Sequence, residues 1–185
     1  MPVADQSGLI RAAQTGDRQA FGQLLADSYD SIHRFAYRWC GNRADAEDIT
    51  QQACIKLAQT IGQFRFEAAF SSWLYRLVIN CAKDWYKSQS RHQHEDLDGW
   101  IEPEPPRDQT AENGIYLQQL LRLLDGFAEG FKETALLVHG EGLTHAEAAE
   151  VLQLKESTVS WRLHEIRKQL QLLQQQPDGS WEASI

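Results

Sequence analysis

The stretch LTHAEAAEVLQLKESTVSWRL, residues 143–163, decides the fold of the C-terminal third of the chain. Thr144 and Glu147 have the spacing of a capping box, in which each side chain satisfies a backbone amide at the start of a helix. Leu154 follows where the chain must turn. The packed face of this first helix is expected to hold Ala146, Ala149 and Leu152.

A second amphipathic helix follows the turn. Its apolar positions recur at helical spacing, at Val159, Leu163, Ile166 and Leu170. The outward positions form a polar, partly basic surface: Ser157, Thr158, Ser160, Trp161, Arg162, His164, Arg167 and Lys168. Two such helices with a tight connection are typical of a helix-turn-helix that enters the DNA major groove, although an ordinary helical hairpin has the same pattern.

The rest of the sequence predicts an all-α protein with two small domains, because apolar residues recur near every 3.6 positions and not every second one. Three apolar stripes, beginning at Phe21, Ala46 and Trp73, predict an N-terminal helical domain over residues 8–88. Residues 89–114 lose this period and contain three prolines among acidic side chains, which predicts a linker. The helical pattern resumes near Tyr116 and runs through Phe127 and Phe131, so the C-terminal domain is expected over residues 115–174.

The charge is distributed unevenly. The net charge is −8, with +1 on residues 1–95, −5 on residues 96–115 and −4 on residues 116–185. An autonomous DNA-binding domain gains much of its affinity by neutralising phosphates and usually presents a basic face. If this chain reads DNA, we therefore expect another protein to bring it there.

Composition and cysteine content narrow the class of protein further. With 42% hydrophobic residues the chain can bury a core, and it has neither a membrane-length apolar run nor the pattern of a signal peptide. We therefore expect a soluble, cytoplasmic protein without membrane insertion. Cys40, Cys54 and Cys81 lie within apolar patterns and make no CxxC pair, so they are expected to be buried thiols without a metal or other cofactor.

Several motifs, in this order, resemble those of the extracytoplasmic-function (ECF) sigma factors of bacterial RNA polymerase. They are DAEDITQQ at residues 45–52, FRFE at 64–67 with SWLYRLVIN at 72–80, and GLTHAEAA at 142–149 with Thr158-Val159 and Arg162-Leu163. The resemblance covers residues 8–90 and 115–172. It implies a factor that directs core RNA polymerase to specific promoters and helps to open the −10 region.

The resemblance implies roles for two parts of the N-terminal domain. The helix that begins at the DAED motif would dock on the polymerase through Asp45, Asp48, Gln51, Gln52 and Lys56. The following loop, residues 63–69, and the helix that begins near Trp73 would bind the non-template strand of the −10 element through Phe64, Arg65, Phe66, Tyr75, Arg76, Asn80, Lys83 and Lys87. Asn80 is the best candidate to read a base, because its amide both donates and accepts. Trp73 and Trp85 are expected in the core, whereas Phe64 and Phe66 suit either the core or DNA.

The C-terminal helix pair would read the −35 element as duplex DNA, through the eight outward residues of the second helix. The sequence departs from the family pattern at Lys155, Ser160, Trp161 and Glu165, so we expect an unusual or weak −35 preference. The family also implies an inhibitory anti-sigma factor as a partner.

Two other classes of protein remain as alternatives. A stand-alone helix-turn-helix regulator is the nearer one, and the acidic C-terminal third disfavours it. An enzyme is the more distant one, because the sequence has no nucleophile–base pair and no glycine-rich phosphate loop. His92, His94 and Glu95 resemble metal ligands, but they fall at the predicted linker and are expected to be solvated.

Overall fold

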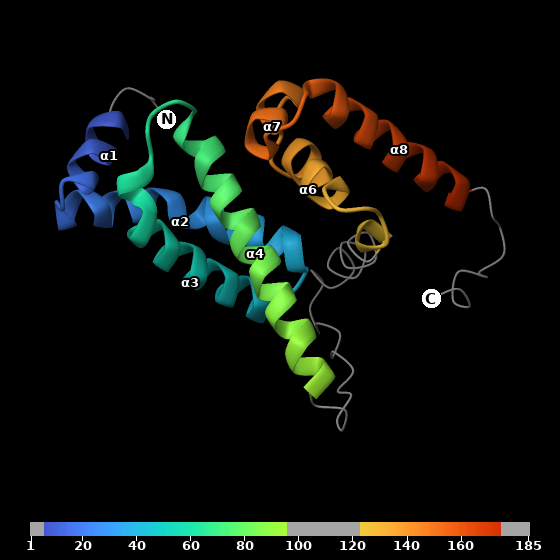
Figure 1. Ribbon diagram of the computed structural model, residues 1–185, viewed down its shortest axis with the longest axis horizontal. Coiled ribbons are helices and arrows are strands. Elements are labelled where there is room, and N and C mark those ends of the chain that lie inside the picture. The colour runs from blue at the N-terminus through green and yellow to red at the C-terminus, as the bar shows by residue number, and fades with distance from the viewer. Residues whose placement is uncertain (1–5, 96–122, 175–185) are drawn as a thin grey trace, which may run out of the picture. The chain divides into compact units, whose positions relative to one another are not determined.

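The computed structural model describes residues 6–95 and 123–174, and these ranges contain helices and no strand, which confirms the predicted all-α class (Figure 1). The chain divides into two compact units, residues 1–126 and 127–185. None of the helices in the described ranges is both long enough and apolar enough to cross a membrane.

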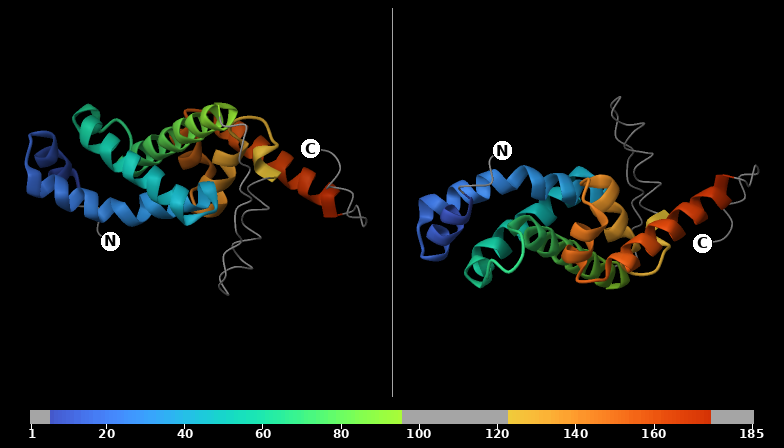
Figure 2. Two further views of the ribbon diagram at one scale, coloured as in Figure 1. Left: turned by 90° about the horizontal axis from the view of Figure 1, so that it is seen from below. Right: turned by 90° about the horizontal axis from the view of Figure 1, so that it is seen from above.

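The first unit is built from α1 (Gln6–Gln14), α2 (Arg18–Cys40), α3 (Arg43–Thr60), the short 3₁₀ turn η1 (Ile61–Gln63) and α4 (Phe70–Glu95). The helix α2 packs against α1, α3 and α4, and α3 also packs against α4 (Figure 2). The largest fully buried side chains of this unit come from all four helices: Ile10, Leu24, Ile32, Phe35, Ile49, Leu57 and Val78. The three predicted apolar stripes therefore do form one core.

Local signals fix where α2 and α3 begin and end. The Asp17 carboxylate accepts hydrogen bonds from the backbone N–H groups of Gln19 and Ala20, which caps the start of α2. Gly41 ends this helix in the left-handed region, at φ 76°, where a side chain would be strained. Asn42 then caps α3. The tight turn between the two caps brings α3 back against α2.

The helix α4 is longer than its apolar pattern predicts. The predicted linker begins at residue 89, whereas α4 continues to Glu95. The apolar stripe ends near Trp85, but no glycine or proline interrupts residues 86–95, and the Lys, Gln, Arg and Glu residues there favour helix. Residues 96–114 of the predicted linker lie outside the described residues.

The second unit contains α6 (Phe131–Ala135), the π-helical turn η2 (Leu136–Gly140), α7 (His145–Leu152) and α8 (Glu156–Gln174). The apolar pattern predicts one helical run through Phe127 and Phe131, and this prediction is wrong. Residues 126–130 form a turn, because Gly130 adopts φ 92° and starts α6 as a separate helix. The beginning of the predicted domain, residues 115–122, lies outside the described residues.

The helix-turn-helix pattern is confirmed in its main features. The capping box is complete: the Thr144 hydroxyl accepts from the Glu147 N–H, and the Thr144 N–H donates to the Glu147 carboxylate at 2.8 Å. Val159, Leu163 and Ile166 of α8 are buried, as predicted. The buried face of α7 differs from the prediction and consists of Ala148, Ala149 and Val151, with Ala146 exposed. Packing against α8 selects this face, and the alanines at positions 146, 148 and 149 made either face plausible from sequence alone.

Candidate nucleic-acid interface

The exposed face of α3 carries four of the five residues that were assigned to polymerase docking. Asp48, Gln51, Gln52 and Lys56 are solvent-exposed. They lie opposite the buried face of the helix, which contains Ala46, Ile49, Thr50, Ala53 and Leu57. The sequence pattern therefore placed these side chains correctly at the surface, where a protein partner can reach them.

The fifth residue, Asp45, has a local structural role. Its carboxylate accepts a hydrogen bond of 2.6 Å from the Asn42 side chain, and its backbone N–H donates to the Asn42 side-chain oxygen at 2.9 Å. This reciprocal pair holds the first turn of α3. The half-buried Asp45 side chain is thus part of the helix cap, and we do not retain it as a docking residue.

A groove of about 380 Å³ lies between α3 and α4. One wall carries Gln52 and Lys56 of the polymerase-assigned set, and the other carries Arg76 and Asn80 of the −10-assigned set. The sequence motifs predict two separate sets of residues, whereas the structure brings members of both to one groove. The groove is also lined by residues that were not among the predicted binding residues: Ile55, Gln59, Thr60, Gln63, Trp73, Leu77, Cys81 and Asp84. A helical repeat of polar residues at Gln52, Lys56, Gln59 and Gln63 is the signal that could have indicated this wall.

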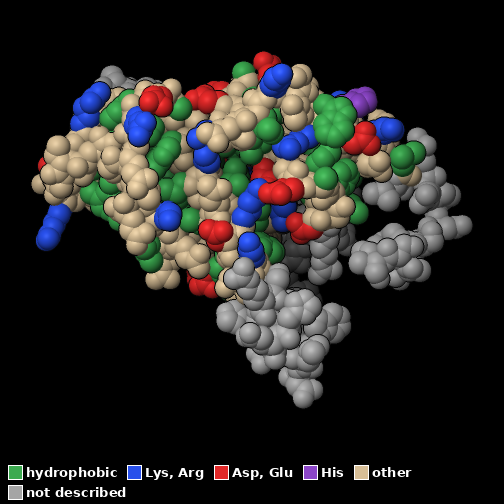
Figure 3. Space-filling model, in the orientation of Figure 1, with side chains coloured by type: hydrophobic (Ala, Val, Ile, Leu, Met, Phe, Trp, Pro, Cys, Tyr) green, Lys and Arg blue, Asp and Glu red, His purple; other side chains and the backbone are tan. Residues whose placement is uncertain are grey.

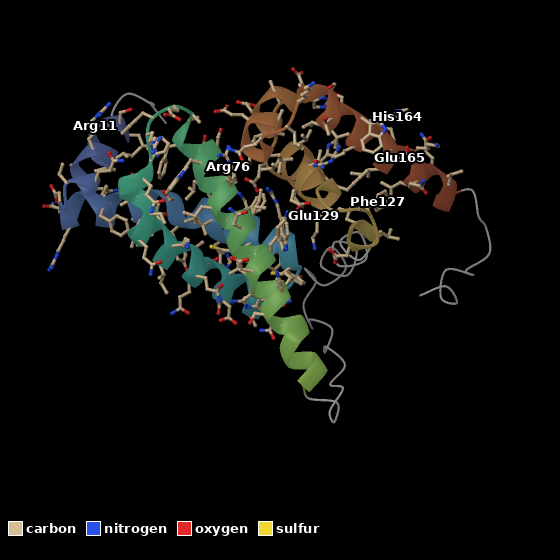
Figure 4. The ribbon with its side chains drawn as sticks, viewed as in Figure 1. Arg11, Arg76, Phe127, Glu129, His164 and Glu165 are labelled. Atoms are coloured by element: carbon tan, nitrogen blue, oxygen red, sulfur yellow. The ribbon has the colours of Figure 1, made fainter. Side chains whose placement is uncertain are left out.

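The chemistry of the groove suits single-stranded nucleic acid. The Asn80 side chain is exposed, and its amide can both donate to and accept from a base edge. The half-buried Trp73 offers an indole for stacking, and Arg76, labelled on α4 in Figure 4, offers a cation for the backbone. Trp73 was expected in the core, and its position at the groove wall corrects this expectation.

The 63–69 loop is tied to α4 by an aromatic cluster formed by Phe64, Phe66, Phe70 and Trp73. The Phe64 ring lies 4.8 Å from Phe66, 5.5 Å from Phe70 and 5.6 Å from Trp73, measured between centroids. The side chain of Phe64 is 6% exposed. Of the two roles that its pattern allowed, Phe64 therefore has the core role, and its assignment as a DNA contact is withdrawn.

Phe66 keeps part of its surface in solvent. It is half-buried, and its backbone lies in the left-handed region at φ 58°. This conformation costs a residue with a side chain roughly 1–2 kcal/mol, so it persists only where surrounding contacts hold it. Arg65 beside it is exposed. Both residues remain candidates for DNA contact.

Tyr75 faces the core side of α4. Its ring packs 5.5 Å from the ring of Phe35 in α2, and it is absent from the groove lining. We therefore withdraw Tyr75 as a base-stacking candidate. Lys87 is exposed and Lys83 is half-buried, and both lie along the helix that carries Arg76 and Asn80. Trp85 is buried, as predicted.

The three cysteines were predicted to be buried thiols, and this prediction is confirmed for one of them. Cys81 is buried, and Cys40 and Cys54 are half-buried. Burial raises the pKa of Cys81 to about 11, with a smaller contribution from the nearby Asp84 carboxylate. The thiol therefore stays protonated near neutral pH. Within the described ranges no three His, Cys, Asp or Glu side chains gather as metal ligands, and the side chains of His92, His94 and Glu95 lie outside the described residues.

The outward surface of α8 is largely as predicted. Its exposed members are Ser157, Ser160, Trp161, His164, Arg167 and Lys168, with Thr158 half-buried. Figure 4 shows His164 and Glu165 on this helix. Trp161 is 56% exposed and meets the Phe131 ring edge-on at 5.5 Å. Ser160 is engaged by α7, because its hydroxyl lies 2.9 Å from Nδ1 of His145.

Arg162 points away from the predicted DNA surface. One guanidinium nitrogen donates to the Gly130 carbonyl at 3.0 Å and to the Thr134 hydroxyl at 3.4 Å, and the group also lies over the Phe131 ring. A Cβ at Gly130 would collide with this guanidinium. Arg162 therefore joins α8 to the start of α6, and its assignment as a −35 contact is withdrawn. Sequence alone could not show this, because the partner carbonyl lies 32 residues away.

A helical unit with a polar groove and a second unit with a helix-turn-helix define a two-part nucleic-acid-binding protein. Similarity to known proteins shows to which family of nucleic-acid-binding proteins the chain belongs. A family model described as Sigma-70 region 2 matches residues 24–92. The chain is 31% identical over 162 residues to the ECF RNA polymerase sigma factor SigM of Mycobacterium tuberculosis, covering 88% of this chain and 81% of that protein.

Two further relatives agree over most of the chain. The ECF RNA polymerase sigma factor SigE of Mycolicibacterium smegmatis is 30% identical over 177 residues, with 91% of this chain and 68% of that protein covered. The ECF RNA polymerase sigma-E factor of Haemophilus influenzae is 29% identical over 180 residues, with 91% and 94% covered. The chain therefore belongs to the ECF sigma factors, the transcription initiation factors that direct core RNA polymerase to promoters.

Solved structures support the fold. CnrH, in complex with the cytosolic domain of CnrY, has a TM-score of 0.69 at 23% identity, covering 95% of this chain and 99% of that one. The sigma factor RpoE of Bartonella quintana, in complex with the anti-sigma factor NepR, has a TM-score of 0.61 at 21% identity, covering 85% and 98%.

Proposed function

We propose a division of labour between the two units. The exposed face of α3, with Asp48, Gln51, Gln52 and Lys56, docks on core RNA polymerase. The α3–α4 groove and the 63–69 loop bind the non-template strand of the −10 element, through Arg65, Phe66, Arg76, Asn80, Lys83 and Lys87. The chain acts by binding and does not itself catalyse a reaction.

The groove is the observation that carries this proposal. It brings an exposed amide, an indole and a guanidinium to one wall, and these groups recognise a base edge, a base face and a phosphate respectively. Gln52 and Lys56 stand on the opposite wall. A strand held in this groove would therefore lie beside the surface that meets the polymerase.

We further propose that α8 reads the −35 element through its remaining outward residues: Ser157, Thr158, Ser160, Trp161, His164, Arg167 and Lys168. Arg167 and Lys168 supply cations for phosphates, and His164 supplies a hydrogen-bonding ring. With Arg162 engaged by α6, this surface has fewer cations than the sequence suggests. The proposal keeps the expected weak or unusual −35 preference.

The functional domains in this proposal are an N-terminal domain that includes all of α4, a linker within residues 96–114, and a C-terminal domain that ends near residue 174. We expect a broad-specificity protease to cut the full chain first within residues 96–114. A first cut inside α2, α3 or α4 would contradict these bounds.

The proposed partners are core RNA polymerase, promoter DNA and an anti-sigma factor, with no membrane insertion and a cytoplasmic location. Relatives in solved complexes support the anti-sigma partner, because one is bound to the cytosolic domain of CnrY and another to the anti-sigma factor NepR. Co-purification of a polypeptide that blocks assembly of the chain with core polymerase would test this part.

The docking face is tested by two variants of α3. Asp48→Arg and Gln51→Ala should weaken assembly with core polymerase on every promoter alike, because this face is assigned to a protein partner. Asp27→Arg on the exposed side of α2 makes the same charge change elsewhere and should leave assembly unchanged. If either α3 variant altered only which promoters are used, the docking assignment would be wrong.

A further inference from the structure

The helix α1 holds the 63–69 loop from outside the groove. The Gln14 side-chain amide donates to the backbone carbonyl of Ile61 at 2.9 Å and to that of Phe64 at 2.7 Å. These two carbonyls lie at the beginning and just past the end of η1, so a single amide spans this turn. Ile10 and Ala13 on the same helix are buried, which fixes α1 and therefore Gln14 in place.

A second contact from α1 reaches the middle of the loop. The guanidinium carbon of Arg11 lies 4.2 Å from the centroid of the Phe66 ring, which is within cation–π range. Phe66 is the loop residue with φ 58°, a conformation that needs outside support. Figure 4 shows Arg11 on α1, which is a different element from the α4 that carries Arg76.

The contacts continue from the loop to the groove. The Phe66 ring packs on Phe64, and Phe64 packs on Trp73, which lines the groove. A shift of Phe66 would therefore be transmitted through Phe64 to Trp73, the member of the cluster that lines the groove. Neither Arg11 nor Gln14 lines the groove itself.

We propose that Arg11 and Gln14 are positioning residues, through which α1 sets the conformation of the 63–69 loop and thereby the base preference at the −10 element. This inference rests on the proposed function, because it requires the loop and groove to bind the −10 strand. A direct phosphate contact by the exposed Arg11 would behave differently, because it would weaken all sequences alike and lower the salt dependence.

The test uses the full chain assembled with core polymerase and a promoter series substituted at each −10 and −35 position. Gln14→Met keeps the length of the side chain and removes its donor, and Gln19→Met at an exposed position of α2 is the matched control. Promoter opening is measured by permanganate reactivity of unpaired thymines. For Gln14→Met we expect discrimination at −10 positions to fall about two- to tenfold, the loss typical of a hydrogen bond, while core binding and discrimination at −35 stay as in the wild type.

The Arg11 variants provide a second measurement at an exposed residue, whereas Gln14 is half-buried. Arg11→Met should lower −10 discrimination about two- to fivefold, as expected for an exposed cation–π contact. Arg11→Lys retains a cation over the ring and should restore it. If Gln14→Met did not fold, these exposed variants would decide the question.

Two results would overturn this inference and leave the proposed function intact. The first is wild-type discrimination at the −10 element in both Gln14→Met and Arg11→Met. The second is a loss of promoter opening that is equal on every promoter. A wild-type protein whose holoenzyme ignores the −10 sequence would overturn the proposed function as well. The outcomes are therefore distinguishable, since the first two require a normal wild-type profile.

Discussion

Asn80 is the residue at which base reading can be separated from phosphate binding. Its amide is exposed on the groove wall and does not contribute to the apolar face of α4, so Asn80→Ala should preserve folding and polymerase binding. Loss of a good base-edge contact costs roughly 1–3 kcal/mol at one −10 position. Lys87→Ala is the comparison, because a lost phosphate contact weakens all promoters nearly equally. Transcription from a −10-substituted promoter series measures both, and an equal loss on every promoter for Asn80→Ala would refute base reading.

On α8, substitutions of Arg162 and Arg167 should separate an effect on stability from an effect on DNA binding. Arg162→Ala removes charged hydrogen bonds to the Gly130 carbonyl and the Thr134 hydroxyl, so we expect the unfolding free energy of the C-terminal unit to fall by about 2 kcal/mol. Arg167→Ala changes an exposed residue and should leave stability intact while weakening −35 binding. Thermal unfolding and −35-dependent transcription measure the two effects. A stable Arg162→Ala protein with altered −35 preference would restore Arg162 to the DNA surface.

At the residue scale, sequence predicted which helix each candidate occupies better than what its side chain contacts. Asp48, Asn80 and Arg167 lie at the surface, because their positions relative to an apolar stripe follow from helical geometry. Phe64 is buried and Tyr75 is half-buried against Phe35 of α2, because the burial of an aromatic ring depends on neighbours distant in sequence. Such pairings are fixed only when the helices pack.

The capping box of α7 gives a prediction at the scale of the element. The hydrogen bonds from Thr144 hold the pKa of Glu147 below its ordinary value of 4.5. A lowered folded-state pKa contributes stability that is present above the unfolded value and is lost as the pH falls through the folded one. Thermal stability of the C-terminal unit should therefore decline at acidic pH by an increment that Thr144→Ala reduces, because alanine removes the hydroxyl donor and keeps the backbone N–H that also donates to Glu147. Glu156→Gln, in the first turn of α8, should leave this increment in place.

Helix beginnings were more predictable than helix ends. Thr144 with Glu147 marks a start through contacts within a few residues, so the local sequence contains the whole signal. The end of α4 has no such signal, because its last residues favour helix without needing an apolar partner. Gly130 interrupts the expected helix through a left-handed backbone, which the apolar period of Phe127 and Phe131 concealed.

At the scale of the whole molecule, the all-α class followed from the sequence, but the shared groove did not. Gln52 and Asn80 belong to different helices, and only the packing of α3 against α4 makes them two walls of one groove. Charge is also a property of the whole chain. Lys and Arg side chains are interspersed with Asp and Glu over the described residues in Figure 3, and the net charge is −8.

This charge balance leads to the last prediction, which concerns the free protein. Neutralisation of DNA phosphates supplies much of the affinity of DNA-binding proteins. This chain has a net charge of +1 on residues 1–95 and −4 on residues 116–185, so it has little excess positive charge for that purpose. The groove proposed to bind the −10 strand and the α8 surface also lie on separate units. The free chain should therefore bind a promoter duplex weakly and with little sequence preference at physiological salt.

Core polymerase should change this result, because in the proposed function it holds the chain at the promoter through the exposed face of α3. Fluorescence anisotropy with one labelled promoter, measured for the free chain, for core enzyme alone and for the two together, gives the comparison. Only the combined sample should discriminate that promoter from a −10 mutant. The Asp48→Arg variant is the internal control, because it should lose discrimination in the combined sample through failed docking. Tight and specific duplex binding by the free chain would instead identify a stand-alone helix-turn-helix activity that the acidic C-terminal unit argues against.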